Sequence, residues 1–178
     1  MDLKKFTSLI DLFLYQAGKQ NPQSAFLEWL NPKNKKKYTW GETSLNIYKL
    51  AKTIKTNIAD GDRCLLVSEN RPEWLISDIA IMLANGITVP AYTTYTEKDY
   101  KYLIEDCQPS VIIVSNDEMH DKLKNIINEK SFIRKVITFE KIQEVDYKNK
   151  YLDFNSITKN NLQESDKIKN SSLKRNSP

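Results

Sequence analysis

The stretch from Gly61 to Trp74 constrains the fold of this chain more than any other part of the sequence. The Asp-Gly-Asp sequence at 60–62, where this stretch begins, predicts a tight turn. The apolar run at 63–67 predicts a buried strand, because it is too continuous for a strand with one wet face. A polar loop follows, and Pro72 stands where a helix would begin, since proline fits the first helical turn.

Helix and strand patterns alternate from residue 41 to residue 139. Apolar residues spaced three and four apart predict helices, and continuous apolar runs predict strands. The predicted helices cover about 41–58, 72–84, 96–107 and 116–130, and the predicted strands cover 63–67, 87–92, 111–114 and 134–139. This alternation indicates an α/β fold, a mostly parallel sheet flanked by helices.

The two ends of the chain differ from this pattern. A helix is predicted from Leu3 to about Lys19, followed by strands at 25–30 and 37–40 that form a small hairpin around the turn at 31–34. After Phe139 the apolar positions become scattered. We therefore expect residues 1–139 to form one α/β subdomain, and 140–178 to be an irregular, partly disordered connecting segment with an unpacked end at 167–178.

Charge and cysteine content narrow the class of protein. The 27 basic and 23 acidic residues are intermixed, and no basic block is interleaved with aromatic residues, which argues against nucleic-acid binding. Cys64 and Cys107 are far apart among apolar or β-prone neighbours, as in a protein with reduced thiols. The sequence has neither a signal peptide nor an apolar run of membrane-spanning length. We expect a cytoplasmic protein.

Few residues have a pattern that suggests chemistry. The only histidine, His120, is predicted at the solvated start of a helix, without a second histidine or cysteine to share a zinc ion. Glu105 and Asp106 are adjacent and so lie on different sides of a helix. Lys122 and Lys124 are predicted on a solvated helix face. The four glycines are too far apart for a phosphate-binding loop. We predict no catalytic, cofactor-binding or metal-binding residue in this chain.

Other distinctive residues have structural explanations. Gly61 and Gly86 are expected for their backbone angles, and Pro72 and Pro90 for turn and helix-start geometry. Trp74 is expected to pack in the core.

Three blocks of sequence, taken together, have a specific order and spacing. The first is Lys37–Glu42, the second is Gly61–Trp74, and the third is Ala84–Thr94, followed by Tyr102–Pro109. Over about residues 20 to 140 the chain resembles the AMP-forming acyl-CoA synthetases. The Arg-Pro-Glu-Trp string at 71–74 is most similar to the long-chain fatty acid–CoA ligases of that family.

The resemblance implies the N-terminal lobe of an adenylate-forming enzyme. Such an enzyme uses ATP, Mg²⁺ and coenzyme A to convert a fatty acid into acyl-CoA, AMP and pyrophosphate. Its phosphate loop, its ribose-binding acidic residue and its catalytic lysine have no counterpart in this sequence, and the loop would be expected soon after Pro178. The resemblance therefore implies an AMP-forming acid–thiol ligase whose N-terminal part, as an isolated chain, binds no cofactor and is inactive.

Three interpretations remain open at this stage. The chain is the N-terminal piece of a long-chain fatty acid–CoA ligase (a truncated product, a partial gene model or half of a split enzyme), or a non-catalytic α/β binding or interaction module derived from that family. An unrelated doubly wound nucleotide-binding enzyme is disfavoured, since no Gly-x-Gly-x-x-Gly follows a strand.

The first interpretation also predicts partners. The intact enzyme would take a long-chain fatty acid and touch the membrane surface peripherally. The isolated chain would bind the missing remainder or self-associate through an exposed apolar face.

Overall fold

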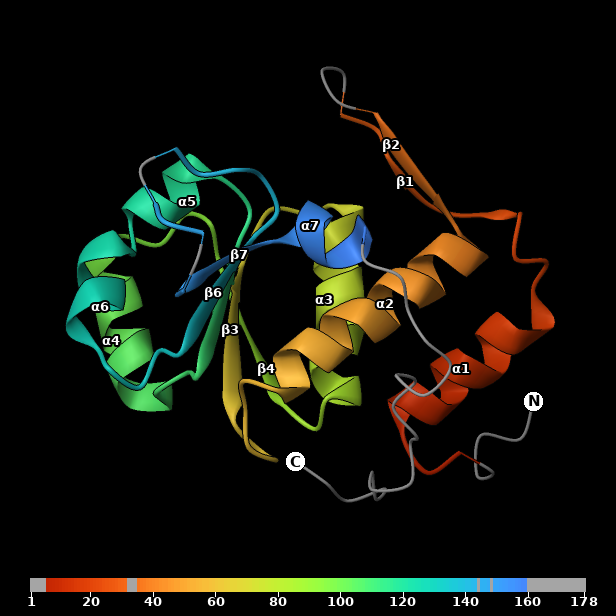
Figure 1. Cartoon of the computed structure of the whole chain (residues 1–178), viewed down its shortest axis with the longest axis horizontal. Coiled ribbons are helices and arrows are strands. Elements are labelled where there is room, and N and C mark those ends of the chain that lie inside the picture. Colours follow the sequence, from red (N-terminus) through yellow and green to blue (C-terminus); the bar gives the residue numbers. More distant parts are fainter. Residues whose placement is uncertain (1–5, 32–34, 144, 148, 160–178) are drawn as a thin grey trace.

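The structure is a computed structural model that describes residues 6–31, 35–143, 145–147 and 149–159. Its centre is a parallel sheet of five strands in the order β4-β3-β5-β6-β7 (Figure 1). The strands are β3 (Arg63–Val67), β4 (Ile87–Ala91), β5 (Val111–Val114), β6 (Lys135–Thr138) and β7 (Tyr151–Asp153). The predicted α/β class with a parallel sheet is confirmed.

Helices cover both faces of this sheet (Figure 1). One face carries α1 (Leu9–Lys19), α2 (Trp40–Lys55), α3 (Pro72–Leu83) and α7 (Phe154–Lys159), and the other carries α4 (Glu97–Cys107), α5 (Asp117–Asp121) and α6 (Lys124–Glu129). Successive side chains of β3 enter different cores: Cys64 and Leu66 belong to the first, Leu65 and Val67 to the second. Burial on both faces explains why this strand is continuously apolar.

Short-range polar contacts fix where the helices begin. Thr39 and Thr96 cap α2 and α4, each in a capping box with an acidic residue three positions later. Asn116 caps α5 through its side chain. The predicted helix 116–130 is interrupted, because α5 ends at Asp121 and α6 begins at Lys124.

Gly61 and Gly86 are required for different structural reasons. Gly61 has φ +81°, which agrees with the predicted turn. Near the end of α3 the left-handed residue is Asn85, with φ 64°, rather than Gly86. A Cβ on Gly86 would lie 3.0 Å from side-chain atoms of Ile58 and Ile81. Gly86 is therefore needed for close packing, which corrects the prediction that its backbone angles are the reason.

Pro90 also differs from its prediction. It lies within β4, paired with Leu66, rather than in a turn or at a helix start. β4 is an edge strand among the described residues, and a residue without an N–H group can be accommodated there because none of the described strands pairs with its outer side.

The segment after residue 139 contains two elements that the sequence pattern did not predict. β7 extends the sheet by pairing Tyr151 with Val136, and α7 buries Phe154 and Ile157 in the first core. A three-residue strand and a six-residue helix contain too few apolar positions to produce a clear period. Residues 160–178, including the stretch predicted to be unpacked, lie outside the described residues.

A separate hairpin stands beside the main sheet. Its strands, β1 (Ala25–Trp29) and β2 (Lys36–Thr39), are antiparallel and form a two-stranded sheet of their own. The hairpin packs against α2 and α3 at one end and projects away from the body at the other (Figure 1). The predicted hairpin is thus confirmed, while residues 32–34 of its turn lie outside the described part of the chain.

Candidate functional site

The chain leaves two adjacent strands of the sheet in opposite directions. β3 continues into α3 on one face, whereas its neighbour β5 continues into α5 on the other face (Figure 1). In open α/β sheets, ligands bind outside the carboxyl ends of the strands at such a switch point. The candidate site is therefore this edge, formed by Ser68–Asn70 after β3, Ser115 and Asn116 after β5, and Phe139 and Glu140 after β6.

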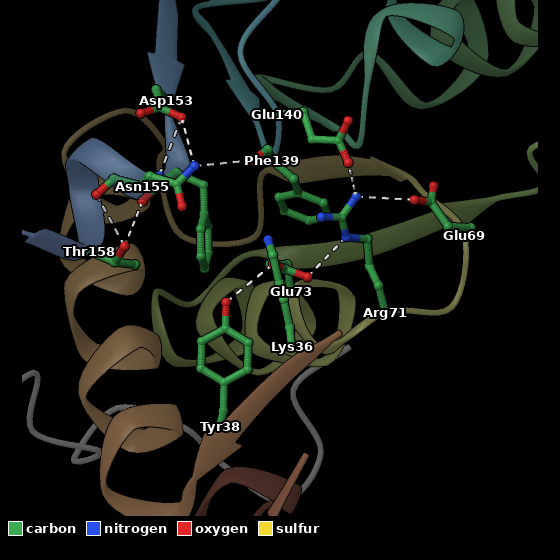
Figure 2. Close-up of polar contacts among 11 residues, drawn as sticks. Lys36, Tyr38, Glu69, Arg71, Glu73, Phe139, Glu140, Asp153, Asn155 and Thr158 are labelled. Carbon is green, nitrogen blue, oxygen red and sulfur yellow. Dashed lines mark hydrogen bonds and ion pairs between the residues drawn. The ribbon is translucent and has the colours of Figure 1, made fainter. Parts of the chain in front are cut away.

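Arg71 is the centre of a polar cluster at this edge (Figure 2). Its side chain is completely buried, yet it contacts three carboxylates. Nε donates to Glu73 at 2.9 Å, and Nη1 donates to Glu69 at 3.1 Å and to Glu140 at 2.8 Å. The planar guanidinium suits such a position because its donors leave in fixed directions.

Two aromatic rings complete the surroundings of Arg71. The guanidinium carbon lies 4.5 Å from the ring centroid of Trp29 and 5.5 Å from that of Phe139. Both distances are in the range of cation–π attraction, which strengthens when the cation is desolvated. Nη2 has no hydrogen-bond partner in the part of the chain that the structure describes.

Glu73 links this cluster to the hairpin. The carboxylate is fully buried, and it accepts from Lys36 Nζ at 2.5 Å and from the Tyr38 hydroxyl at 3.2 Å. Burial alone would raise the pKa of Glu73, but hydrogen bonds from Arg71 and Lys36 hold that pKa below its ordinary value. Burial and the negative charge of Glu73 raise the pKa of Tyr38. Glu73 is therefore ionised and Tyr38 protonated at neutral pH.

The charges of this cluster favour a structural role. Burial opposes the charge on Arg71, but hydrogen bonds with Glu73 and Glu140 more than compensate and raise its pKa. The guanidinium thus stays charged, and its Nε and Nη1 donate to protein carboxylates. A cation whose partners are already present does not supply the free positive charge that phosphate binding needs. The arrangement fixes segments in place and offers no proton for transfer near neutral pH.

His120 lies in the interior and not on the surface. Its side chain is 6% exposed, and Nε2 is 2.9 Å from the hydroxyl of Tyr151. Burial lowers the pKa of His120 below its ordinary value, although Asp121 and Asp117 act in the opposite direction. The prediction of a solvated histidine was wrong, because β7 supplies a partner that the sequence pattern did not predict.

A cavity of about 630 Å³ adjoins this histidine. Its lining includes Asp117, His120, Asp121, Lys124 and Tyr151. Lys124 pairs with Asp121 at 3.2 Å, so part of its charge is already balanced. Lys122 donates to the carbonyl of Thr93 at 2.8 Å, which connects α5 to the segment after β4.

The other residues singled out in the sequence have structural roles. Trp74 is partly buried against the first core, as predicted. Cys64 is buried and Cys107 half-buried, and both are free thiols. Glu105 and Asp106 are exposed on α4, where Glu105 pairs with Lys130 at 2.8 Å.

The described residues contain neither a cluster of metal-ligating side chains nor a membrane-spanning helix. Within 6–31, 35–143, 145–147 and 149–159, no group of three or more His, Cys, Asp or Glu side chains could hold a metal ion. Across the same residues, every helix is too short or too polar to span a lipid bilayer.

Comparison with known sequences places the chain among AMP-binding enzymes. The family model for AMP-binding enzymes matches residues 14–176. The chain is 31% identical to the human mitochondrial acyl-coenzyme A synthetase ACSM5 over 106 residues, which are 58% of this chain and 18% of that protein. It is 35% identical to a long-chain-fatty-acid–CoA ligase of Bacillus subtilis over 79 residues, 44% of this chain and 14% of that ligase. The matched residues thus cover less than a fifth of the length of these curated relatives.

Solved structures support the same fold. The anthranilate CoA ligase AuaEII superimposes with a TM-score of 0.73 at 20% identity, over 89% of this chain and 30% of that one. The acetoacetyl-CoA synthetase of Streptomyces lividans gives a TM-score of 0.74 at 16% identity, over 86% of this chain and 25% of that one. The sequence match over most of the chain, on a fold shared with such enzymes, shows that this chain belongs to the AMP-binding enzyme family.

Proposed function

We propose that this chain is the N-terminal part of a long-chain fatty acid–CoA ligase. The intact enzyme would join a fatty acid to the α-phosphate of ATP with release of pyrophosphate. The thiol of coenzyme A would then displace AMP from the acyl-adenylate. The single observation that carries this proposal is the family match over residues 14–176.

The preference for long acyl chains has separate support. The Bacillus subtilis and rat relatives are both long-chain-fatty-acid–CoA ligases, and the rat protein ACSBG1 is 26% identical over 112 residues. The Arg71–Trp74 string agrees with this subgroup. Glu73 and Arg71 of this string form the buried cluster beside the switch point.

As an isolated chain, this part of the enzyme is proposed to be inactive. Adenylation requires backbone N–H groups around the phosphates and a cation facing the oxygen that develops charge. The sequence has four glycines, well separated from one another, and the buried Arg71 is already engaged by three carboxylates. We also propose that the chain is cytoplasmic, which agrees with its two free cysteines.

The remainder of the enzyme is the proposed partner, and self-association is the alternative when the remainder is missing. Large apolar side chains that are exposed include Leu30 directly after β1, Tyr92 directly after β4 and Tyr102 on α4. Such groups are suited to burial against another part of a larger protein.

A chimaera tests the proposed function. The matching segment of the Bacillus subtilis ligase would be replaced by the corresponding residues of this chain, and acyl-CoA formation from palmitate and from acetate would be measured. We expect a folded chimaera that retains activity and prefers palmitate. A chimaera that is folded but makes no acyl-CoA, while the parent enzyme does, would contradict the proposal.

A further inference from the structure

We infer that Arg71 is a positioning residue that couples the β1–β2 hairpin to the carboxyl end of β6. One side chain then contacts both the hairpin and the candidate site, in addition to the packing of the hairpin against α2 and α3. This coupling is independent of the proposed ligase activity, because it depends only on contacts within the chain.

Arg71 contacts the hairpin in two ways. Its guanidinium faces the ring of Trp29 in β1, 4.5 Å from the centroid. Its Nε shares the buried carboxylate of Glu73 with Lys36 and Tyr38 of β2. Loss of Arg71 would therefore remove a ring contact from one strand and part of the charge balance from the other.

Arg71 contacts the β6 exit just as closely. Nη1 donates to Glu140 at 2.8 Å, and the ring of Phe139 lies 5.5 Å from the guanidinium carbon. Figure 2 shows Arg71 between Glu140 and Phe139 on one side and Glu73 and Lys36 on the other. A direct path of contacts thus leads from Glu140 through Arg71 to Trp29 and, by way of Glu73, to Lys36 and Tyr38.

The hairpin depends on such contacts for its order. An isolated two-stranded hairpin is at best marginally stable in water, so contacts with the body decide how often it opens. A change at Glu140 that loosens Arg71 should therefore appear as faster opening of the hairpin. Lysine could not replace Arg71 fully, because its ammonium lacks the flat surface and the directed donors that serve these contacts at once.

Hydrogen exchange on the 178-residue protein tests this coupling. In Glu140→Gln we expect the backbone amides of β1 and β2 to exchange several-fold faster, while those of β5 are unchanged. The matched control is Glu105→Gln. Glu105 is 45% exposed and lies 2.8 Å from Lys130, whereas Glu140 is 47% exposed and lies 2.8 Å from Arg71. We expect the control to leave hairpin exchange unaltered.

A second variant tests whether Arg71 is the connection. Arg71→Lys keeps the charge and should speed hairpin exchange by about tenfold, equivalent to about 1.4 kcal/mol of opening free energy. Adding Glu140→Gln to Arg71→Lys should then change hairpin exchange little, since the link is already broken. If the two effects multiply, or if Glu140→Gln alone leaves the hairpin unchanged, the inference is wrong. If Arg71→Lys does not fold, the hairpin exchange rates of Glu140→Gln and Glu105→Gln still test the inference.

Discussion

The guanidinium of Arg71 and the carboxylate of Glu73 lie 2.9 Å apart, and neither side chain has any exposed surface. Both charges are removed from water, so removing either one leaves the other desolvated with fewer counter-charges, which costs free energy. The pair therefore makes both residues necessary for the fold.

Replacing Glu73 tests this dependence. Glu73→Gln keeps the size of the side chain but leaves Arg71 and Lys36 without their buried counter-charge. We expect a loss of about 3–5 kcal/mol in the free energy of unfolding, measured by urea denaturation at pH 7. Glu118→Gln is the control, since Glu118 is exposed and 3.6 Å from Lys122; it should change stability by less than about 0.5 kcal/mol. Equal effects of the two substitutions would show that the buried pair has no special importance.

The stability of the protein should fall as the pH drops below the ordinary histidine range. Burial lowers the pKa of His120 in the folded state, so the unfolded chain binds a proton at His120 more readily. The contribution of the neutral, buried His120 to the free energy of unfolding is complete above about pH 6.5, and it is lost as the pH falls from there towards the folded-state pKa. His120→Gln should reduce this pH dependence, measured by urea unfolding between pH 7.5 and pH 5.

The same histidine can be observed directly. His120 is the only histidine, so its ring resonances in an NMR titration belong to one residue. They should titrate below the value of the urea-unfolded chain. A folded-state pKa at or above the unfolded value would contradict the described burial and its effect.

The two cysteines should differ in reactivity. Burial raises the pKa of Cys64 to about 12, and Cys64 has no exposed surface. Cys107 is only half-buried, although burial also raises its pKa. Because the thiolate is the reacting form, a disulfide reagent at pH 8 should modify Cys107 first and Cys64 only on unfolding. Cys107→Ser and Cys64→Ser variants assign the two rates, and equal rates in the folded protein would rule out the described difference in burial.

Two glycines should respond oppositely to alanine. Gly61 has φ +81°, which alanine adopts only with strain, so Gly61→Ala should destabilise the protein by about 1 kcal/mol. Gly18 is within α1, and an added Cβ would have no atom within 4 Å. Gly18→Ala should stabilise by up to about 1 kcal/mol through reduced chain entropy. Thermal melting of both variants checks whether the melting temperature falls for Gly61→Ala and rises for Gly18→Ala. Destabilisation by both substitutions would count against the described turn and helix.

Local patterns in the sequence predicted most of the fold. The strand 63–67 was predicted with its observed limits. Leu65 and Leu66 are buried on opposite faces of the sheet, so the sequence of this strand is apolar without interruption and easy to recognise. The proline at the start of α3 was also predicted correctly. Such features depend on neighbours in sequence, which is why they could be read from the sequence alone.

The candidate site could not be predicted in this way. Arg71 and Glu140 are 69 positions apart, and no local period relates a charge after β3 to a charge after β6. His120 was expected on the surface because its partner, Tyr151, lies in a strand too short to recognise. Long-range pairs of this kind depend on the order of the strands in the sheet, which the sequence pattern does not specify.

Pyrophosphate release by the purified 178-residue chain tests the central claim most directly. The chain would be mixed with ATP, Mg²⁺, coenzyme A and palmitate, beside the Bacillus subtilis ligase as a positive control. We predict no release above the rate without protein, because we propose that the residues that hold the triphosphate belong to the remainder of the enzyme. Palmitate-dependent release that increases in proportion to the concentration of this chain would contradict the account.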